Sequence, residues 1–507
     1  DRAHPRELWT FVRPLLQDAI CGQIDRDDRE RLHRVALAFW SHRAEQTAEA
    51  DRDRTLAAIA RHAEALGDAP PSIAAHLDLG DRARAAHRYA DADWHYTRAL
   101  VVTGEDNLRQ TARALRGRGS VRYRLHRVQE SIDDLRRACR ISVLTCARAE
   151  QAELLLEYST ALDWAGQYGA SARCIDQIPG RIDLDAEPAI YARYLAARGR
   201  SEYRRGDTEA ALATLARARR LLLREADTEW TLITLLLLGP LLDRDKQVDR
   251  AEQRFAEAAA LCERTGDRFH LCVVYLNRAW LWLTEPDDPA EGSRRALDDL
   301  RRARRIARQT GQPILERGAV HNIAELYHWC GQHEAALVYA RRALRLQRFL
   351  PEPVTTDALL LARVLIALRL WSEAKPHVER VRSLIQSERD TSQLRENLTL
   401  LALEQLLAYD ESSGTPRHRE QYVDTRSDAR ARWRSILDRA GDQMSNEELI
   451  EIKYIRALDA ERQGDRDALV ETVESIREDL AQTPLLSGLV RDLSARAAAL
   501  IQELSET

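Results

Sequence analysis

The residues of this chain that could bind a metal ion gather between positions 321 and 333. His321 and His328 are seven residues apart and would share one face of a helix. Cys330 and His333 follow at the next turn. Zinc binds such nitrogen and sulfur ligands in tetrahedral sets, but these spacings are not those of a zinc motif. We therefore expect no metal site, and no Cys–His nucleophile, because nothing beside the pair would stabilise an oxyanion.

Motifs for nucleotide chemistry and for known catalysis are missing from the sequence. No Gly is followed by Lys, so the chain has no P-loop, and it has no HExxH, HRD, DFG or GxSxG motif. Gly117-Arg118-Gly119 begins like a dinucleotide-binding loop but continues Ser-Val-Arg, without a preceding strand. Helix packing explains these glycines better. We therefore expect neither catalysis nor a cofactor.

The composition indicates a folded chain without a dedicated nucleic-acid or membrane function. Among 507 residues, 44% are hydrophobic and 31% charged, and the net charge of −4 lacks the basic excess of nucleic-acid binders. Seven cysteines without a CxxC pair favour a reducing cytoplasm. The longest apolar run, 232–242, is about half of the ~20 residues that span a bilayer. Because the chain begins Asp-Arg-Ala-His-Pro, without Met, we expect a fragment of a larger protein.

A repeat of about 40 residues organises most of the sequence. Each copy predicts a helix with a small residue in its middle, a turn containing Gly or Asp, and a second helix with an Ala-xxx-apolar-xx-Ala pattern. The first small residues of the second helices are Ala92, Ser131, Ser171, Ala211, Ala251, Ala296, Ala336 and Ala374. In seven of these eight copies, the small residue of the first helix lies 12 positions earlier: Gly80, Gly119, Ser159, Gly199, Gly239, Ala324 and Ala362. The copy of Ala296 carries a longer loop at 284–292.

The sequence outside the repeats is helical but less regular. We expect eight repeats in 73–390, a connecting helix in 46–72, and degenerate helical repeats with a C-terminal cap in 391–507. The last region predicts helices at 394–409, 428–440, within 447–480, and at 485–504. The predicted fold class is therefore all-α, built from helix-turn-helix units.

At these residues the chain resembles the tetratricopeptide repeat (TPR) family. The shared motifs are Gly166-Gln167-Tyr168, Leu238-Gly239, Ala251-xxx-Phe255-xx-Ala258 and Trp371-xx-Ala374. The period near 40 exceeds the usual 34, and the Trp of the first helix and the Pro ending the second are missing. The longer unit looks like that of kinesin light chains and of the sensor arms of bacterial signalling ATPases. The resemblance implies a right-handed superhelical solenoid, in which Tyr168, Phe255 and Trp371 belong to the core.

Residues 1–45 do not fit the repeat and resemble a different segment. In STAND-type ATPases and in ATPase-linked bacterial kinases and cyclases, a winged-helix domain ends Phe-x-x-Pro-Leu-x-x-x-Ala-Ile and is followed by Arg-xx-Leu-His. The corresponding residues here are Phe11, Pro14, Leu15, Ala19, Ile20, Arg29 or Arg31, Leu32 and His33. The resemblance implies a remnant of an ATPase-linked junction upstream of a helical arm.

The TPR resemblance also implies that the first helix of each unit lines a concave groove, and it selects two groups of groove residues. The first group is Arg113, Arg116, Tyr123, Arg124, Trp164, Arg193, Arg200, Tyr203 and Arg204, with Asp163 beside Trp164. The second group is Arg244, Trp282, His321, Glu325, His328 and Trp329. We hypothesise that the first group grips an acidic peptide or anion through forked arginine hydrogen bonds, and that the second stacks an aromatic or apolar group.

The two resemblances together imply a non-catalytic arm that binds a protein, peptide or effector and regulates an upstream ATPase or kinase module of the same polypeptide. Binding would shift the population of array conformations. Two alternatives remain open: a stand-alone adaptor between proteins, and a receptor for an anionic or sugar-like small molecule. The expected partners are a protein or acidic peptide and the upstream module, and not a membrane or nucleic acid.

Overall fold

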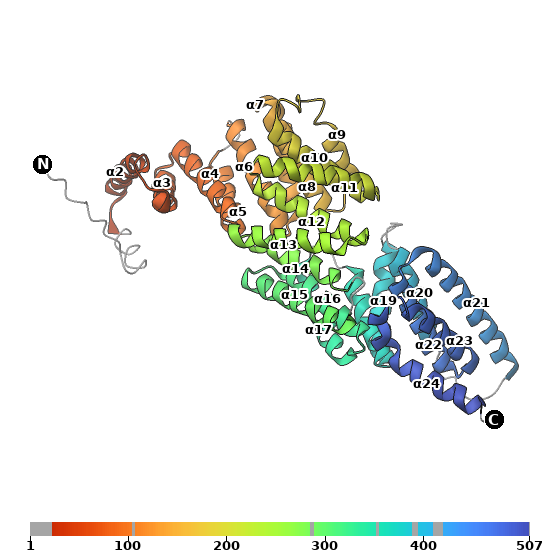
Figure 1. Ribbon diagram of the computed structural model, residues 1–507. Coiled ribbons are helices and arrows are strands. Elements are labelled where there is room, and N and C mark those ends of the chain that lie inside the picture. The colour runs from red at the N-terminus through yellow and green to blue at the C-terminus, as the bar shows by residue number, and fades with distance from the viewer. Residues whose placement is uncertain are drawn as a thin grey trace. The chain divides into compact units, whose positions relative to one another are not determined.

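The structure is a computed structural model that describes residues 23–103, 107–283, 288–350, 354–387, 394–408 and 419–505. Every regular element in these ranges is a helix, and consecutive helices pair side by side as hairpins (Figure 1). The structure thus confirms the all-α class and the helix-turn-helix repeat. None of the helices in these ranges is both long enough and apolar enough to cross a bilayer.

The described residues form two compact units. The first comprises the described residues up to Leu237 together with Arg264–Asp267, and the second comprises Leu238–Glu263 and the described residues from Arg268 onward. The division falls inside a helix, α12, within the span 73–390 for which the sequence predicts one continuous array.

The first unit consists of consecutive α-helices, with a short 3-10 helix, η1 (Glu49–Asp51), before α3. They are α2 (Arg26–Ala44), α3 (Arg52–Leu66), α4 (Ala69–Ala85), α5 (Tyr89–Thr103), α6 (Leu108–Arg122), α7 (Val128–Thr145), α8 (Arg148–Trp164), α9 (Tyr168–Asp176), α10 (Pro188–Arg204), α11 (Thr208–Arg224) and the start of α12 (Thr228–Arg244). A short 3-10 turn, η2 (Tyr123–Leu125), ends α6.

The second unit continues the hairpins and adds further helices. After α12 come α13 (Val248–Thr265), α14 (Arg268–Leu281), α15 (Pro289–Gln309), α16 (Pro313–Trp329), α17 (His333–Leu346), α18 (Thr355–Ala367), α19 (Trp371–Ser387), α20 (Leu394–Leu407), α21 (Arg419–Gln443), α22 (Asn446–Gln463), α23 (Arg466–Leu480) and α24 (Ser487–Ser505). The last five helices correspond to the predicted helical segments 394–409, 428–440, 447–480 and 485–504, although α21 starts earlier than expected.

The predicted repeat positions lie where two helices of a hairpin meet. All eight small residues of the second helices, from Ala92 on α5 to Ala374 on α19, are buried. On the first helices, a Cβ added at Gly199 would lie 2.7 Å from Leu215, and one added at Gly239 would lie 2.6 Å from the ring of Phe255. Small residues therefore let the two backbones approach, and a large apolar side chain fills the space beside them.

Gly117 and Gly119 have the same packing role, as the sequence indicated. A Cβ at Gly117 would lie 2.3 Å from the ring of Tyr96 on α5, and one at Gly119 would lie 2.6 Å from Leu135 on α7. Side chains of both neighbouring second helices thus pack against the glycines of α6, which do not form a phosphate-binding loop.

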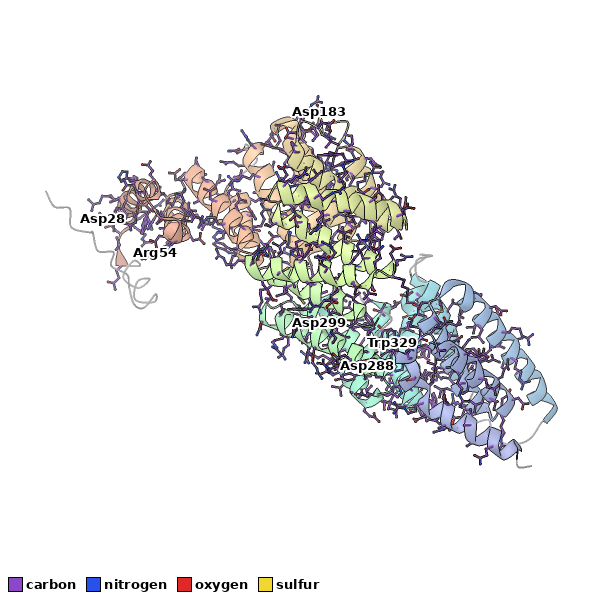
Figure 2. All side chains as sticks on the ribbon, in the orientation of Figure 1. Asp28, Arg54, Asp183, Asp288, Asp299 and Trp329 are labelled. Atoms are coloured by element: carbon purple, nitrogen blue, oxygen red, sulfur yellow. The ribbon has the colours of Figure 1, made fainter. Side chains whose placement is uncertain are left out.

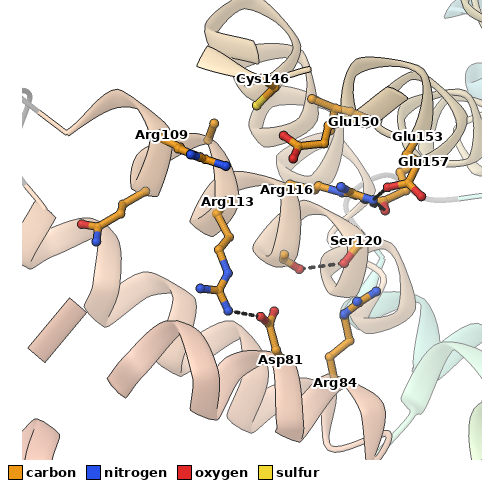
Figure 3. Close-up of a pocket in the computed structure, with 14 residues that line it drawn as sticks. Asp81, Arg84, Arg109, Arg113, Arg116, Ser120, Cys146, Glu150, Glu153 and Glu157 are labelled. Atoms are coloured by element: carbon orange, nitrogen blue, oxygen red, sulfur yellow. Dashed lines mark hydrogen bonds and ion pairs between the residues drawn. The ribbon is translucent and has the colours of Figure 1, made fainter. Parts of the chain in front are cut away.

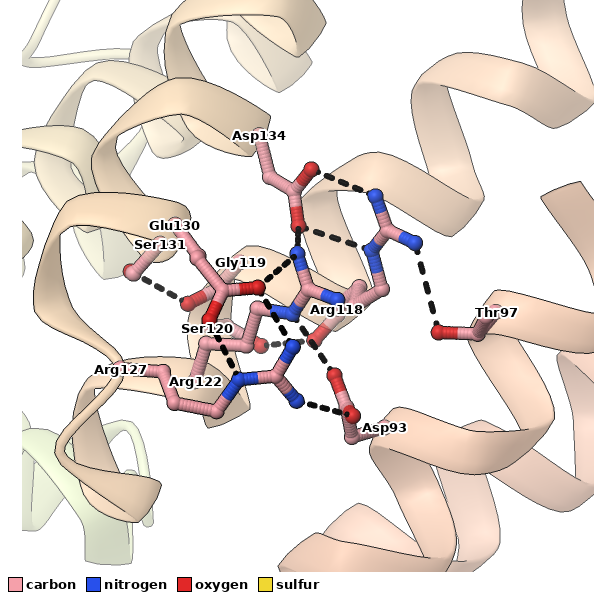
Figure 4. Close-up of polar contacts among 11 residues, drawn as sticks. Asp93, Thr97, Arg118, Gly119, Ser120, Arg122, Arg127, Glu130, Ser131 and Asp134 are labelled. Carbon is pink, nitrogen blue, oxygen red and sulfur yellow. Dashed lines mark hydrogen bonds and ion pairs between the residues drawn. The ribbon is translucent and has the colours of Figure 1, made fainter.

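A buried ionic network joins α6 to its two neighbouring helices, α5 and α7 (Figure 4). Arg118 donates two hydrogen bonds to Asp134 of α7, at 2.8 and 2.7 Å, and Arg122 donates to the same carboxylate and to Asp93 of α5. Arg127 completes the set through Asp93, at 2.7 Å. Removing one charged side chain of this network would leave its partner as an uncompensated buried charge. The network therefore holds α6 in one position against α5 and α7.

In the second unit, the C-terminal helices complete one apolar core with α16–α19. Buried side chains of α18, α20, α22, α23 and α24 belong to a single cluster. The turn after α16 meets the start of α24 so closely that a Cβ at Gly488 would lie 2.4 Å from the backbone of Cys330. Trp329, at the end of α16, lies beside this cluster, and Figure 2 shows it among the side chains of the second unit.

The N-terminal predictions concern residues that the structure covers only in part. Phe11, Pro14, Leu15, Ala19 and Ile20 lie outside the described residues. The Arg-xx-Leu-His segment lies on α2, and the connecting helix predicted at 46–72 corresponds to α3, with α4 beginning already at Ala69.

Candidate functional site

The first helices of successive hairpins, which we call the inner helices, carry charges of alternating sign in the first unit. Acidic residues on α4 face arginines on α6, which face acidic residues on α8, then arginines on α10 and an acid before α12. The residues of these rows are Asp78 and Asp81; Arg113 and Arg116; Glu153, Glu157 and Asp163; Arg193, Arg200 and Arg204; and Asp227.

Arg116 joins the second and third rows. Its Nε and Nη2 atoms donate to Glu157 Oε1 at 3.0 and 2.7 Å, and Nη2 also donates to Glu153 at 3.0 Å. Attraction by Glu157 raises the pKa of Arg116, which outweighs the opposite effect of burial. The side chain therefore has a fixed orientation and an internal anionic partner.

Glu153 continues the chain of contacts to α10. Its other oxygen accepts a hydrogen bond from Arg193 at 3.1 Å, and Arg193 in turn donates to Asp227 at 2.6 Å. Arg113, at the other end of the rows, pairs with Asp78 and Asp81 and remains half-exposed. The arginines that the sequence analysis assigned to an acidic ligand are thus partly neutralised by the protein itself.

Two predicted arginines lie too deep to meet a ligand. Arg200 is 4% exposed and donates to the hydroxyls of Thr160 and Ser159, both at 3.0 Å, and burial lowers its pKa. Arg124 is 3% exposed and pairs with Glu229 while lying 4.5 Å from the ring centroid of Tyr123. We therefore leave Arg124 and Arg200 out of the proposed ligand-contacting surface.

A pocket opens between α4, α6 and α8, with a volume of about 740 Å³ (Figure 3). It includes the predicted residues Arg113 and Arg116. The lining is Asp81, Arg84, Arg109, Gln110, Ala112, Arg113, Arg116, Gly117, Ser120, Cys146, Glu150, Glu153, Leu154 and Glu157. Four arginines and four carboxylates thus surround one cavity, whose size is typical of a ligand site.

Several charged groups of the pocket have no partner among the described residues. The side chain of Arg84 forms no hydrogen bond or ion pair with them, and its Nε atom is buried. The side chains of Arg109 and Glu150 likewise form no hydrogen bond or ion pair with the described residues. Glu157 uses Oε1 for Arg116 and leaves its buried Oε2 atom unpaired. In Figure 3, Arg84 reaches into the pocket from α4 and Arg109 from the opposite side.

This arrangement is suited to a ligand that both accepts and donates hydrogen bonds. Burial disfavours the charge on Arg84, but attraction by Glu157 and Glu229 outweighs it, and the pKa of Arg84 is raised. A permanently charged donor and an unpaired carboxylate oxygen therefore lie in one cavity. Because buried polar groups without partners are costly, a ligand that satisfies both groups gains affinity.

Beyond the pocket, aromatic residues gather at the C-terminal ends of α6, α8 and α10 and at the start of α9. The ring of Trp164 stacks on that of Tyr123, with centroids 5.9 Å apart and planes at 27°. Arg204 forms a forked pair with Asp163, at 3.1 and 2.9 Å, and lies over the rings of Tyr168 and Tyr203. Tyr168 is 45% exposed, so the prediction that it belongs to the core is wrong; Phe255 is buried as predicted.

The second predicted group does not form an open stacking surface. The guanidinium of Arg295 lies 3.7 Å from the ring centroid of Trp282, whose Nε1 donates to Asp299 at 2.8 Å. Arg244 is exposed at the end of α12. The face of Trp282 on which a ligand would stack is therefore covered by the protein's own arginine.

The polar members of that group pair with residues of later helices. His321 contacts Asp357 of α18 at 2.8 Å, and Arg363 pairs with Glu325 at 3.2 Å. His328 is buried and lies 3.3 Å from Glu451 of α22. The anion beside His328 comes from α22 of the same unit, so this group serves internal packing. The repeat pattern alone does not reveal this contact with α22.

Trp329 and the histidines do not combine into a metal site. The ring of Trp329 meets that of Trp280 at 5.7 Å and 61°. His328 and His333 face each other, with Nδ1 atoms 3.3 Å apart. Within the ranges that the structure describes, no group of three or more His, Cys, Asp or Glu side chains could hold a metal ion.

No protein-family model matches this chain, and no curated protein matches it by sequence. Among solved structures, it is similar to the Rap protein in complex with competence and sporulation factor, at 14% identity and a TM-score of 0.47, covering 66% of this chain and 91% of that one. It is also similar to a STAND protein with a tetratricopeptide repeat sensor from Pyrococcus horikoshii, at 14% identity and a TM-score of 0.44, covering 73% of this chain and 54% of that one.

A third similar structure is the human IFIT1 dimer with m7Gppp-AAAA, at 15% identity and a TM-score of 0.43, covering 84% of this chain and 90% of that one. At these identities and TM-scores, the similarity concerns the arrangement of helices and does not identify a ligand.

Of the pocket residues, Arg113 and Arg116 were predicted from the sequence, and Arg84, Arg109, Glu150 and Glu157 were not. One signal was present for Arg84, which follows the small residue Gly80 by four positions, as Tyr123 follows Gly119. No local pattern distinguishes Arg109, Glu150 or Glu157 from the many exposed charges of this chain, because their common cavity arises only when three hairpins stack.

Proposed function

We propose that this chain is a non-catalytic binding protein that captures a peptide segment in the pocket between α4, α6 and α8. One observation carries this proposal: an unsatisfied donor, Arg84, and an unsatisfied acceptor, Glu157 Oε2, line the same cavity of about 740 Å³. An extended peptide offers both kinds of group, because its backbone and charged side chains donate and accept hydrogen bonds.

The balance of charges refines the original hypothesis of a purely acidic ligand. The pocket holds Glu150 and Glu157 as well as Arg84 and Arg109. A ligand with only negative charges would be repelled by the carboxylates, whereas an acidic residue next to a basic one would meet a partner for each charge. The favoured peptide therefore carries a carboxylate and a cation on adjacent residues.

Calorimetric titration with short unlabelled peptides tests this function. We expect a peptide containing Asp-Lys to bind more tightly than matched peptides containing Asp-Ala, Ala-Lys or Ala-Ala. Arg84→Glu should abolish the preference for Asp, and Arg54→Glu is the matched control, because Arg54 is an exposed arginine on α3 outside the pocket. Equal binding of all four peptides, or equal effects of both variants, would contradict the proposal.

The pocket is also large enough for a small zwitterion, such as a free amino acid or a sugar-like molecule with an attached charge. The same titration separates this alternative, because a free amino acid that binds as tightly as the Asp-Lys peptide would favour a small-molecule receptor over peptide capture.

A finer proposal concerns regulation. The resemblance of residues 11–33 to the segment that follows an ATPase core supports a sensor arm whose ligand controls an upstream ATPase or kinase of the same polypeptide. The coding sequence upstream of Asp1 tests it directly. A P-loop or kinase motif there, with nucleotide hydrolysis that changes when the Asp-Lys peptide is added, is the expected result; a stand-alone adaptor predicts neither.

The cysteines bear on the cellular location of the protein. Cys139, Cys146, Cys174, Cys262, Cys272 and Cys330 are free thiols. Free thiols are typical of proteins that work in a reducing compartment. We therefore propose a cytoplasmic location.

A further inference from the structure

The aromatic residues at the ends of α6, α8 and α10, together with Tyr168 at the start of α9, form a second surface of the first unit, which we call the aromatic shelf. It consists of Tyr123, Trp164, Tyr168, Tyr203 and Arg204. Trp164 is 43% exposed and Tyr168 is 45% exposed, although both are large aromatic side chains that normally lose most of their surface on folding. Arg204 links the two positions, because it pairs with Asp163, the residue before Trp164, and lies over the ring of Tyr168. Two exposed large aromatic side chains at the junction of α8 and α9 indicate a contact surface.

Contacts with neighbouring side chains fix the orientation of the shelf residues. Tyr123 is buried and supports the ring of Trp164 from one side. Arg204 is fixed by both oxygens of Asp163, which itself is buried, and its guanidinium lies 4.8 Å from the ring centroid of Tyr168. Aromatic rings whose orientation is already fixed lose little entropy when they bind a flat partner.

The shelf continues the pocket along the same two helices. Trp164 follows Glu157 by seven residues on α8, and Tyr123 follows Arg116 by seven residues at the end of α6. Seven residues are two helical turns, so both aromatic side chains lie on the pocket side of their helices, about 10 Å from the charged groups. An extended peptide covers that distance with about three residues.

We propose that the aromatic shelf is a second subsite, which takes an aromatic side chain of the same peptide whose charged residues enter the pocket. This inference rests on the proposed function and specifies its ligand: an acidic and a basic residue, followed or preceded about three positions away by Phe, Tyr or Trp. The incoming ring would stack on Trp164. Arg204, which covers the ring of Tyr168, would add a cation–π contact from the side.

A nucleobase could also stack on such a shelf, but the neighbouring pocket argues against nucleic acid. Phosphates beside the shelf would meet Glu150 and Glu157 as well as the arginines. The alternating rows also pair most of the arginines with carboxylates of the protein, which leaves no continuous basic path for a phosphate backbone.

The test compares the peptides Asp-Lys-Gly-Gly-Trp and Asp-Lys-Gly-Gly-Ala by calorimetric titration of the full chain. We expect the Trp peptide to bind about tenfold more tightly, which is typical of one well-placed aromatic anchor. Trp164→Ala should remove this advantage and leave the affinity for the Ala peptide unchanged. Trp94→Ala is the matched control, because Trp94 is a 55% exposed tryptophan on the second helix α5, outside both surfaces.

The spacing provides an independent measurement. Peptides with zero to six glycines between Lys and Trp should show the highest affinity at two or three glycines. A constant affinity across the series would overturn the subsite, as would a Trp164→Ala variant that weakens both peptides equally. Tighter binding of an unstructured oligoadenylate, lost in Trp164→Ala, would overturn it in favour of a nucleic-acid surface.

The results also separate the two proposals. If the Ala peptide binds and depends on Arg84, but Trp adds nothing, the pocket function stands and the aromatic subsite is wrong. If neither peptide binds and Arg84→Glu has no effect, both proposals are wrong.

Discussion

Arg116 and Glu157 are joined by two hydrogen bonds, at 3.0 and 2.7 Å, across a sequence separation of 41 residues. The same separation of 40 or 41 residues joins Arg193 to Glu153 and Arg204 to Asp163. This distance is one repeat of the hairpin pattern, so equivalent positions of neighbouring inner helices carry opposite charges. The arginine excess on these helices therefore serves first to join adjacent hairpins.

The Arg116–Glu157 pair should contribute measurably to stability. We expect a double-mutant cycle of Arg116→Ala and Glu157→Ala to give a coupling energy of about 1–3 kcal/mol, because both side chains are largely buried and hydrogen-bonded. The exposed pair Arg26–Glu30 on α2 is the control, with an expected coupling below about 0.5 kcal/mol. Chemical denaturation measures both, and equal couplings would contradict this account of the rows.

The close packing of Gly117 predicts a clear difference between two glycine substitutions. Gly117→Ala should destabilise the first unit by about 1–3 kcal/mol, because the new methyl group would overlap the ring of Tyr96. Gly318→Ala, in the middle of α16, should instead stabilise by about 0.5–1 kcal/mol, since no atom would lie within 4 Å of the new Cβ. Thermal unfolding of the two variants checks the prediction, which a neutral Gly117→Ala would refute.

Asp357 should be essential for the second unit. It is fully buried and accepts hydrogen bonds from Arg317 at 2.9 Å, His321 at 2.8 Å and Gln347 at 2.9 Å. Asp357→Ala would leave Arg317 without its buried anion, at a cost of about 3–5 kcal/mol.

Hydrogen exchange locates this effect. We expect faster exchange in α16 and α18 of the Asp357→Ala variant, with α6 and α8 unchanged. Asp298→Ala, which removes a half-exposed carboxylate on α15, is the control and should leave exchange in both regions as in the parent chain. Unchanged protection of α16 in Asp357→Ala would show that this cluster is not structurally required.

The second unit should lose stability in mild acid. Burial and the nearby His328 lower the pKa of His333 to about 4, and burial also lowers that of His328. Below the ordinary histidine pKa of 6.5, the unfolded chain binds protons that the folded state does not. Stability therefore falls as the pH drops from about 6.5 to 4, by up to about 1.4 kcal/mol per pH unit for His333, and protonation of His328 acts in the same direction.

His333→Gln tests this pH dependence. We expect the variant to show a flatter decline in melting temperature between pH 6.5 and 4 than the parent chain does. His42→Gln, an exposed histidine on α2, should leave the profile as it is. A decline of the same slope in His333→Gln would mean that other groups cause the acid sensitivity.

The hairpins were predictable because their signals are local. Ala211 and Gly199 mark the contact of α10 with α11 by residue size and spacing alone, and the structure buries the Ala and packs Leu215 on the Gly. The division within α12 was not predictable, since the apolar run around Leu238 looks like any other first helix of the array.

The candidate site was predictable only in part. The groove positions implied by the TPR resemblance included Arg113 and Arg116, but they could not show that Glu153 and Glu157 pair with Arg116 from the next hairpin. Tyr168 was misplaced because its position at the start of a second helix is interior in the family, whereas here its ring lies under Arg204 at the surface. Such outcomes depend on which side chain a neighbouring hairpin supplies, and a single helix does not contain that information.

The alternating charges of the inner helices restrict how this array can change its length. Removing or duplicating a single hairpin between α4 and α12 would bring two rows of like charge face to face, either two acidic rows or two arginine rows. Gain or loss of hairpins in pairs would keep the alternation in phase. In this part of the chain, the unit that evolution can copy or delete without electrostatic penalty is therefore about 80 residues long, twice the structural repeat.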